Sequence, residues 1–226
     1  MRRISIIIPV LNEEKILEKS LLALQSIKDE RVEVVVVDGG SADDTVSIAE
    51  RYADQVIQSE VGRAKQLNKG AGSATGDLYL FLHADTILPP NAFDGVQKIS
   101  NEEYWGRFNV QLDASGFLFR VIEKMMNWRS CLTGIVTGDH AVFISKKLFG
   151  RVGGFPDIAL MEDIAVSRKL RKFVKPRCLS SAVVTSSRRW EQGGVVSTIL
   201  LMWRLRLAYF LGENPCKLNQ RYRSVR

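Results

Sequence analysis

Residues 4–10, Ile-Ser-Ile-Ile-Ile-Pro-Val, form an almost wholly apolar run that is typical of a strand buried on both faces of a parallel sheet. Residues 13–27 follow with helical spacing, because their apolar side chains recur at Ile16, Leu17, Leu21, Leu24 and Ile27. Residues 32–37, Val-Glu-Val-Val-Val-Val, predict a second buried strand. This strand–helix–strand order is the beginning of an α/β pattern.

The alternation continues along the first half of the chain. Ser41-Ala-Asp-Asp44 resembles a capping box that opens a helix to about Ala53, and a strand over 55–59, a helix over 63–74 and a strand over 78–82 follow. The pattern predicts an α/β fold with a mostly parallel central sheet flanked by helices, in which ligands bind beyond the carboxyl ends of the strands. In the second half we expect strands at 107–112, 141–144 and 177–185, and helices at 117–132, 163–173 and 195–211.

Length and charge indicate one domain over residues 1–226 with a distinct end. The chain has 226 residues, 46% hydrophobic and 25% charged, and a net charge of +7. Residues 1–167 carry about −5 and residues 168–226 about +12. We interpret 187–226 as a basic helical segment that packs on the domain, forms a homodimer contact or lies at a membrane surface. Nucleic acid is disfavoured as a partner, because aromatic residues are not interleaved with the basic ones.

The cysteines and the apolar runs predict the compartment. Cys131, Cys178 and Cys216 form no CxxC pair, so neither a zinc site nor a disulfide framework is expected, and a reducing compartment fits best. The longest uncharged stretch near the C-terminus, 192–203, is shorter than the roughly 20 residues of a spanning helix. The expected location is therefore cytoplasmic, with peripheral association at the inner face of the membrane as an alternative.

Candidate ligand-binding residues follow the predicted strands. Neither a G-x-G-x-x-G nor a P-loop motif is present, so a bound nucleotide needs another source of positive charge, such as a metal ion on a carboxylate. In extended chain, His83 and Asp85 face the same side, and Asp85 with diphosphate oxygens suits Mg²⁺ or Mn²⁺. The alternative is that Asp85 caps the next turn. Asp38 can accept a hydrogen bond from uracil N3–H, or it can be an Asp-Gly turn residue.

Two further acids and one loop are candidates for catalysis. Glu162 and Asp163 open a predicted helix, where one of them can act as a general base towards an acceptor hydroxyl or simply complement the helix dipole. Gly138, Asp139 and His140 lie on a loop that can line the acceptor side of the same cleft. His140 is equally compatible with an ordinary surface or core histidine.

Taken together, these motifs resemble the family 2 glycosyltransferases of the GT-A fold. The resemblance rests on Ile-Pro-Val-Leu-Asn12-Glu13, Val-Val-Asp38-Gly-Gly-Ser, Gly62-Arg63-Ala-Lys-Gln66-Leu-Asn68, Phe-Leu-His83-Ala-Asp85, Gly153-Gly-Phe, Met161-Glu162-Asp163 and Ser187-Arg188-Arg189-Trp190. The Arg63, His83 and Arg188 segments are most similar to a short bacterial subgroup found beside radical-SAM or selenium-related genes.

The resemblance implies an inverting enzyme that uses a nucleotide-sugar donor, usually a UDP-sugar, with a divalent cation. By matching position, Pro9 and Glu13 would flank the uridine, Asp38 would contact uracil and Arg63 the base or ribose. Asp85 would bind the metal and Asp163 would be the catalytic base. Arg188, Arg189 and Trp190 would lie near the diphosphate or the acceptor, which is either a small molecule or lipid-linked.

Two departures from the family pattern matter. The first Asp of the D-x-D motif is His83 here, which affects the ribose contact and the charge at the metal. Ser186 stands where processive members carry the Gln of Q-x-x-R-W, which favours a non-processive enzyme. The alternative functions are a sugar nucleotidyltransferase and a non-catalytic nucleotide-sugar-binding protein.

Overall fold

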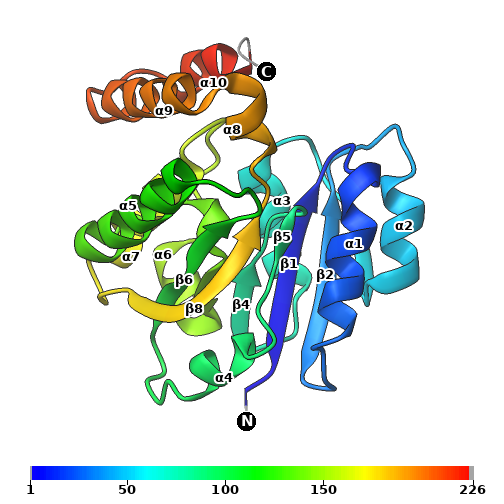
Figure 1. The fold of residues 1–226 in the computed structure, drawn as a ribbon. Coiled ribbons are helices and arrows are strands. Elements are labelled where there is room, and N and C mark those ends of the chain that lie inside the picture. The colour runs from blue at the N-terminus through cyan, green and yellow to red at the C-terminus, as the bar shows by residue number, and fades with distance from the viewer. Residues whose placement is uncertain (1, 224–226) are drawn as a thin grey trace.

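An eight-stranded mixed sheet forms the centre of the structure, a computed structural model that describes residues 2–223 (Figure 1). The strand order is β3-β2-β1-β4-β7-β6-β8-β5. Strands β1, β2, β3 and β4 pair in parallel, as do β6 and β8, whereas β7 pairs antiparallel with both β4 and β6, and β5 with β8. The strands are β1 (Ile4–Val10), β2 (Val32–Asp38), β3 (Gln55–Gln58), β4 (Leu78–Phe81), β5 (Thr86–Ile87), β6 (Trp105–Leu112), β7 (Val142–Ser145) and β8 (Arg177–Thr185).

Helices cover both faces of this sheet and one of its edges. Figure 1 shows that the α8–α10 segment lies above the edge at which β1 ends, opposite the N-terminus. The helices are α1 (Glu14–Gln25), α2 (Thr45–Tyr52), α3 (Arg63–Ser73), α4 (Ala92–Gln97), α5 (Phe117–Thr133), the 3₁₀ turn η1 (Gly138–His140), α6 (Lys146–Val152), α7 (Glu162–Leu170), α8 (Arg188–Gly193), α9 (Val195–Phe210) and α10 (Pro215–Arg223).

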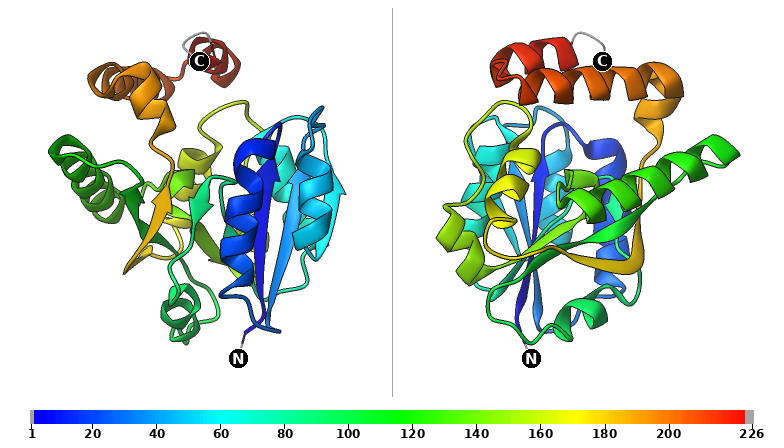
Figure 2. Two further views of the ribbon diagram at one scale, coloured as in Figure 1. Left: turned by 45° about the vertical axis from the view of Figure 1, so that its right-hand side comes forward. Right: turned by 90° about the vertical axis from the view of Figure 1, so that its left-hand side faces the viewer.

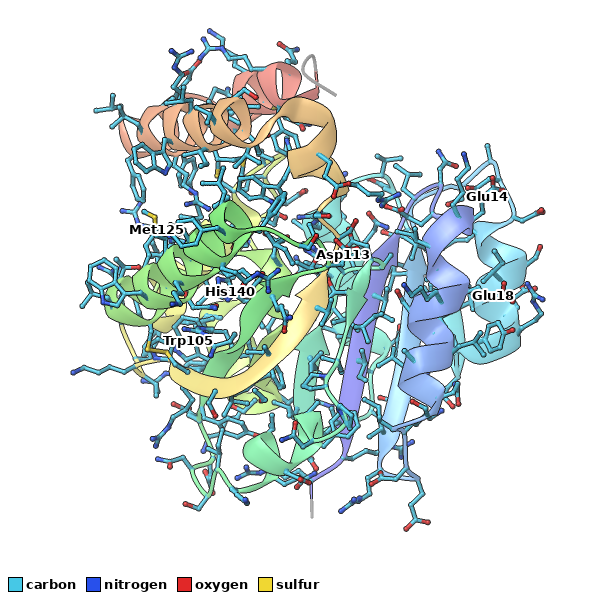
Figure 3. The ribbon with its side chains drawn as sticks, in the orientation of Figure 1. Glu14, Glu18, Trp105, Asp113, Met125 and His140 are labelled. Carbon is cyan, nitrogen blue, oxygen red and sulfur yellow. A yellow bond between two sulfur atoms is a disulfide. The ribbon has the colours of Figure 1, made fainter. Side chains whose placement is uncertain are left out.

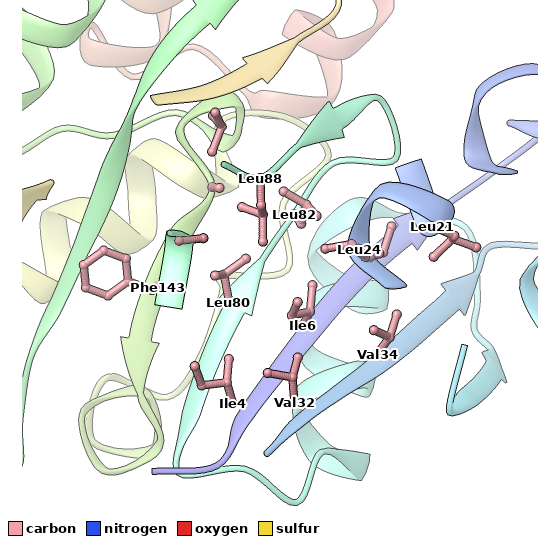
Figure 4. Close-up of a cluster of buried hydrophobic side chains, with 14 of the residues drawn as sticks. Ile4, Ile6, Leu21, Leu24, Val32, Val34, Leu80, Leu82, Leu88 and Phe143 are labelled. Carbon is pink, nitrogen blue, oxygen red and sulfur yellow. The ribbon is translucent and has the colours of Figure 1, made fainter. Parts of the chain in front are cut away.

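The alternation of side chains along β1 separates two large apolar clusters. Ile4, Ile6 and Ile8 pack with α1, α2 and α4 on one face (Figure 4), whereas Ile7 packs with α3, α6 and α7 on the other. Strand β1 is therefore buried on both sides, as the apolar run predicts. Each such buried side chain contributes about 1.5–3 kcal/mol of transfer free energy, so the two clusters fix β1 and its neighbours as a rigid platform.

A third and much smaller apolar cluster attaches the C-terminal helices. Leu205 of α9 and Leu218 of α10 pack on Ile135, Met161 and Ile164, which flank η1 and begin α7. The predicted α/β fold with flanking helices is confirmed, and the sheet is parallel in its N-terminal half and mixed beyond it.

The expectation that the cysteines stay unpaired is wrong for two of them. Cys131, near the end of α5, forms a disulfide with Cys178 at the start of β8, with their Cα atoms 6.0 Å apart. The two residues are 47 positions apart, and β8 brings them together by pairing with β6, the strand that precedes α5. Such an encounter depends on tertiary structure, so cysteine spacing alone does not reveal it. Cys216 is free and exposed.

The predicted capping box at Ser41 is also wrong. Helix α2 begins at Thr45, and no capping hydrogen bond is made by the side chain of its N-cap residue, Asp44. Ser41 instead donates its hydroxyl to Asp38 across the turn after β2, and Asp43 accepts from the backbone N–H of Thr45. The polar run 41–45 therefore organises a loop at the carboxyl edge of the sheet.

Candidate active site

The loops that follow β1 and β2 are tied together at the carboxyl edge of the sheet. Asp38 ends β2 with 1% of its surface exposed, and its carboxylate accepts from the backbone N–H groups of Gly40 and Ser41 and from the Ser41 hydroxyl. Ser41 Oγ also accepts from the N–H of Asn12, and Asn12 Oδ1 accepts from that of Ala42. Asp38 thus serves in the turn, as one of its two interpretations requires, while its uracil contact stays a prediction.

Gln66 of α3 stabilises the same edge through side-chain hydrogen bonds. This residue is buried, and its Nε2 donates to the carbonyl oxygens of Val10 at 2.9 Å and Val37 at 2.8 Å. A buried amide that donates hydrogen bonds to the carbonyl oxygens at the ends of two adjacent strands holds those strand ends in a fixed relative position. Gly39 passes so close to Gln66 that a Cβ there would lie 3.1 Å from Nε2.

The side chain of His83 contacts that of Asp139. Its Nδ1 is 3.4 Å from Asp139 Oδ1. The extended geometry expected for residues 83–85 is wrong, because β4 ends at Phe81 and the chain turns at Ala84–Asp85, with the Thr86 N–H donating to the His83 carbonyl. Burial acts to raise the pKa of Asp139, but the hydrogen bond and the charge of His83 outweigh it, so the pKa of Asp139 is lowered.

Gly138 allows the contact between His83 and Asp139 to form. A Cβ at this position would overlap the His83 ring, so the backbone of η1 approaches His83 as closely as only glycine permits. The N–H of Gly138 donates to Asp163 Oδ2 at 3.0 Å. The loop therefore contacts both His83, which follows β4, and the first turn of α7.

Glu162 and Asp163 begin α7 beside an arginine from another helix. Glu162 is 4% exposed, and its Oε1 lies 3.6 Å from Arg63 NH1 at the start of α3. Burial raises the pKa of Glu162, the charge of Arg63 opposes that rise and Asp163 adds to it. Asp163 is half-buried, and backbone N–H groups hold both its oxygens, that of Ile164 at 2.7 Å and that of Gly138 at 3.0 Å.

Unusual backbone conformations concentrate around these loops. In the described residues the non-glycine positions with positive φ are Asn12 (54°), Ala141 (47°) and Met161 (71°), which lie after β1, after η1 and directly before α7. Such conformations cost of order 1–3 kcal/mol each and persist where the surroundings hold them. Ser167 supplies one such restraint, because its hydroxyl bonds to the backbone of Val136 and to the Asp163 carbonyl.

Asp85 is a partly exposed carboxylate at this edge of the sheet. Its Oδ2 lies 4.0 Å from Arg188 NH2 at the start of α8. The described residues contain no group of three or more His, Cys, Asp or Glu side chains that could hold a metal ion by themselves. Mg²⁺ is commonly bound by one or two carboxylates together with substrate phosphates and water, and Asp85 fits that arrangement.

The other predicted site residues have varied surroundings. Pro9 lies in β1, and Glu13 directly precedes α1, its N–H donating to Thr45 Oγ1. Arg189 stacks on Tyr222 of α10, with its guanidinium carbon 3.8 Å from the ring centroid, and donates to the Tyr222 hydroxyl. The N–H of Trp190 bonds to the Ser187 carbonyl in α8.

His140 is a core histidine in this structure (Figure 3). It is fully buried, and its Nδ1 lies 3.0 Å from the Phe108 carbonyl oxygen. Burial, assisted by the charge of Arg107, lowers the pKa of His140 to about 3. The ring is therefore neutral at physiological pH, and it supports η1 from inside.

Two polar residues that shape the site were not among the predicted site residues. Gln66 is one, and Asn68 is the other, since its side-chain amide exchanges two hydrogen bonds with the backbone of Phe155, at 2.8 and 2.9 Å. A Cβ at Gly154 would lie 2.6 Å from Asn68 Oδ1, which explains the glycine before Phe155. Both amides belong to the Gly62–Asn68 motif, so their presence in a helix facing an apolar sheet is the signal that could have revealed them.

The convergence of these residues determines the class of protein. Three separate segments bring candidate residues to the carboxyl edge of an α/β sheet, where ligands bind in such folds: the β4–β5 connection with His83 and Asp85, α3 with Arg63, and α7 with Glu162 and Asp163. Acidic side chains beside Arg63, together with Asp85 near Arg188, are suited to the transfer of a group from a phosphate-activated donor. The sheet and this site define a GT-A-type glycosyltransferase domain.

Comparison with known proteins gives the family. The model of "Glycosyl transferase family 2" matches residues 5–133, and the chain belongs to this family. A PGL/p-HBAD biosynthesis glycosyltransferase of Mycobacterium bovis is 39% identical over 171 residues, which cover 67% of this chain and 62% of that relative. An undecaprenyl-phosphate 4-deoxy-4-formamido-L-arabinose transferase of Photorhabdus laumondii is 28% identical over 116 residues, 46% of this chain and 35% of its own length.

The solved structures agree on the fold. S. aureus TarS (residues 1–349) in complex with UDP-GlcNAc superposes with a TM-score of 0.66 at 20% identity, over 81% of this chain and 58% of that one. The chain spans between 33% and 48% of the length of the undecaprenyl-phosphate 4-deoxy-4-formamido-L-arabinose transferases that it matches. Membership of the radical-SAM-associated subgroup stays a prediction.

Proposed function

We propose that this chain catalyses the inverting, non-processive transfer of a sugar from a nucleotide diphosphate sugar, a UDP-sugar, to an acceptor hydroxyl. Membership of family 2 supports the reaction class. The observation that carries the proposal is the first turn of α7, where Asp163 is held by two backbone N–H groups next to Glu162 and Arg63. A fixed carboxylate of this kind suits proton removal from an alcohol.

In the proposed reaction, the acceptor oxygen attacks the anomeric carbon while the bond from that carbon to the diphosphate breaks. Asp163 takes the hydroxyl proton, and the electron pair of the broken bond leaves with the nucleoside diphosphate. Attack on the face opposite the leaving group inverts the configuration. General-base assistance of this kind is worth about 10²–10⁴-fold.

Positively charged side chains stabilise the leaving group in this proposal. Arg188 and Arg63 both lie beside acids of the site, within 4.0 Å of Asp85 and 3.6 Å of Glu162, and both are about half exposed. Pro9, Glu13 and Asp38 are proposed for the uridine end, because they follow the two strands that Gln66 joins. Glu162 positions Arg63, and Gly138 and Asp139 line the acceptor side next to Asp163.

A divalent cation, Mg²⁺ or Mn²⁺, is proposed as the cofactor, with Asp85 as its protein ligand. Such an ion supplies Lewis-acid stabilisation of the phosphate charge. Asp85 is the carboxylate of the His-Ala-Asp segment, and its partly exposed side chain near Arg188 can face the diphosphate.

Two variants with matched chemistry test this proposal. We expect D163N to retain UDP binding, measured as a thermal shift with UDP and Mn²⁺, and to lose about 10²–10⁴-fold in sugar transfer or donor hydrolysis. D85N should instead lose the part of the UDP-induced shift that depends on Mn²⁺. Unchanged turnover in D163N would contradict the base assignment, and release of pyrophosphate would indicate a nucleotidyltransferase. Binding of UDP-sugars without turnover, in the presence of candidate acceptors, would indicate a non-catalytic binding protein.

A further inference from the structure

Large apolar side chains are exposed mainly on two helices. Of the fifteen that are exposed in the described part of the chain, five belong to α5 and six to α9 and the residue that ends it. Monomeric proteins rarely expose contiguous apolar patches of this kind unless the patch binds something. The α5 residues are Phe117, Leu118, Met125, Trp128 and Leu132, and the α9 residues, which we call the α9 stripe, are Val196, Leu200, Trp203, Leu207, Phe210 and Leu211.

The α9 stripe lies on one side of the helix. At about 100° of rotation per residue, its six members fall within an arc of about 100°. Their exposed fractions run from 46% to 79%. Leu205, which is buried against Ile135 and Met161, lies on the opposite side. The helix is therefore attached through one face, and the opposite, apolar face is exposed. Figure 2 shows that α9 lies at the outer end of the molecule.

Two arginines border the stripe. By the same rotation, Arg204 and Arg206 lie about 80° to either side of its centre. No acidic residue occurs between Gly194 and Gly212. Arg204 is exposed, whereas Arg206 is partly buried and its Nε lies inside the structure. An apolar arc that contains Trp and Phe and is bordered by an exposed arginine is the pattern of a helix lying in a membrane interface, where the arginine stem follows the apolar face and its charge reaches the headgroups.

The neighbouring elements add positive charge to this end of the molecule. Lys217 and Arg221 of α10 and Arg188 of α8 are exposed. Residues 188–223 carry seven basic and two acidic side chains. A second copy of the chain would bring the same positive surface against itself in a symmetric dimer, whereas an anionic bilayer complements it.

We propose that the α9 stripe docks the protein on the surface of an anionic membrane, with α9 parallel to the bilayer plane. No helix in residues 2–223 is long and apolar enough to cross a membrane. The exposed apolar residues of α5 provide a second apolar surface. Figures 1 and 2 show that α5 lies on the same side of the molecule as α9.

Docking there would bring the bilayer close to the candidate catalytic loops. Leu205 packs on Met161, the residue directly before Glu162, and on Ile135, which lies three residues before Gly138. Under the proposed function, an acceptor embedded in the membrane would thus be presented on the side of Asp163. The docking itself is independent of the proposed reaction and can be tested without it.

Vesicle co-sedimentation tests the docking surface. The full chain is expected to sediment with vesicles of equimolar phosphatidylglycerol and phosphatidylcholine at low salt, to bind pure phosphatidylcholine far less, and to be released at about 0.5 M NaCl. The variant W203Q/L207Q should lose about tenfold or more of this binding. The matched control is L22Q/V61Q, which changes an exposed apolar residue of α1 and another in the loop between β3 and α3. This control should bind vesicles as the wild type does.

Several outcomes would overturn the proposal. One is failure of the wild-type protein to sediment with anionic vesicles, and another is equal vesicle binding by W203Q/L207Q. A third is that neither protein binds vesicles, while the wild type is a dimer and W203Q/L207Q is a monomer. That result would assign the α9 stripe to a contact with a second copy of the chain. Circular dichroism establishes that the variant is folded, as its exposed positions predict. UDP binding in solution should be unchanged in W203Q/L207Q, so a failed docking test and a failed proposed function give different results.

Discussion

A single buried carboxylate at the end of the sheet away from the candidate site links stability to pH. Glu33 of β2 is 4% exposed and accepts hydrogen bonds from Ser5, from the N–H and hydroxyl of Thr75, and from the N–H of Gly76. Burial acts to raise the pKa of Glu33, but these hydrogen bonds outweigh it and lower the pKa below its usual value of 4.5. The folded state therefore favours the ionised form.

This shift gives a prediction for E33Q. At pH 7 the variant should unfold with a free energy about 1–3 kcal/mol lower than that of the wild type, because the amide replaces a charged acceptor. Because the pKa is lowered on folding, the advantage of the wild type is complete above about pH 4.5 and is lost as the pH falls through the lowered value. Urea unfolding at a series of pH values checks this. The exposed Glu102, which pairs with Lys147 at the surface, provides the control, since E102Q should unfold at nearly the same urea concentration as the wild type at each pH.

At the same scale, sequence motifs proposed Asp163, Glu162, Arg63 and Asp85 as candidate site residues but did not reveal the side-chain contacts around them. The contact of His83 with Asp139 was not predicted, because it joins residues 56 positions apart and depends on the turn at Ala84–Asp85. Extended geometry was assumed for a segment in which the strand had already ended, and the error in placing His83 follows from that assumption.

At the scale of elements, helix α3 fixes the relative position of the ends of two strands. Gln66 places α3 under the ends of β1 and β2 through its two hydrogen bonds to backbone carbonyl oxygens. Q66L keeps a side chain of similar size but removes both donors. We expect the free energy of unfolding to fall by about 1–3 kcal/mol, because each buried carbonyl loses a partner.

Urea unfolding measures this change, and a wild-type stability in Q66L would show that the two bonds are not needed. The exposed Gln58 of β3 provides the control: Q58L should shift stability by less than about 0.5 kcal/mol.

The elements that sequence patterns predicted are those with a complete local signal. Strands β1, β2 and β4 have apolar runs and α1 has helical spacing, so each was predicted within a few residues of its bounds, as were α3, α5 and α9. The short elements were missed: α4 contains Gly95 and α6 contains Gly150, which weaken the helical signal. Strand β5 has two residues and exists because Thr86 and Ile87 pair with β8, a contact that no local pattern contains.

At the scale of the whole molecule, the structure shows where the basic C-terminal part of the sequence lies. The basic residues 188–223 form the layer above the carboxyl edge of the sheet, over the acids at the start of α7. That arrangement places positive charge where an activated phosphate ester and a membrane surface would both be attracted. Composition alone predicted the asymmetry, but the small cluster around Leu205 and Leu218 decides which face of the domain receives it.

One covalent link constrains a large part of this architecture. The Cys131–Cys178 disulfide closes a loop that contains η1, β7, α6 and α7, and with them Asp139, Glu162 and Asp163. Closing a loop of 47 residues restricts the unfolded chain and should stabilise the folded state by about 2–4 kcal/mol.

Reduction should therefore lower the free energy of unfolding by that amount, which chemical denaturation with and without dithiothreitol measures. The double variant C131S/C178S should match the reduced protein and be insensitive to the reductant. The variant C216S removes the free, exposed cysteine and should behave as the wild type does under both conditions. If the oxidised and reduced wild-type proteins unfolded at the same denaturant concentration, the link would not be formed in solution, and the site loops would depend on Ser167, Gly138 and Asn68 for their position.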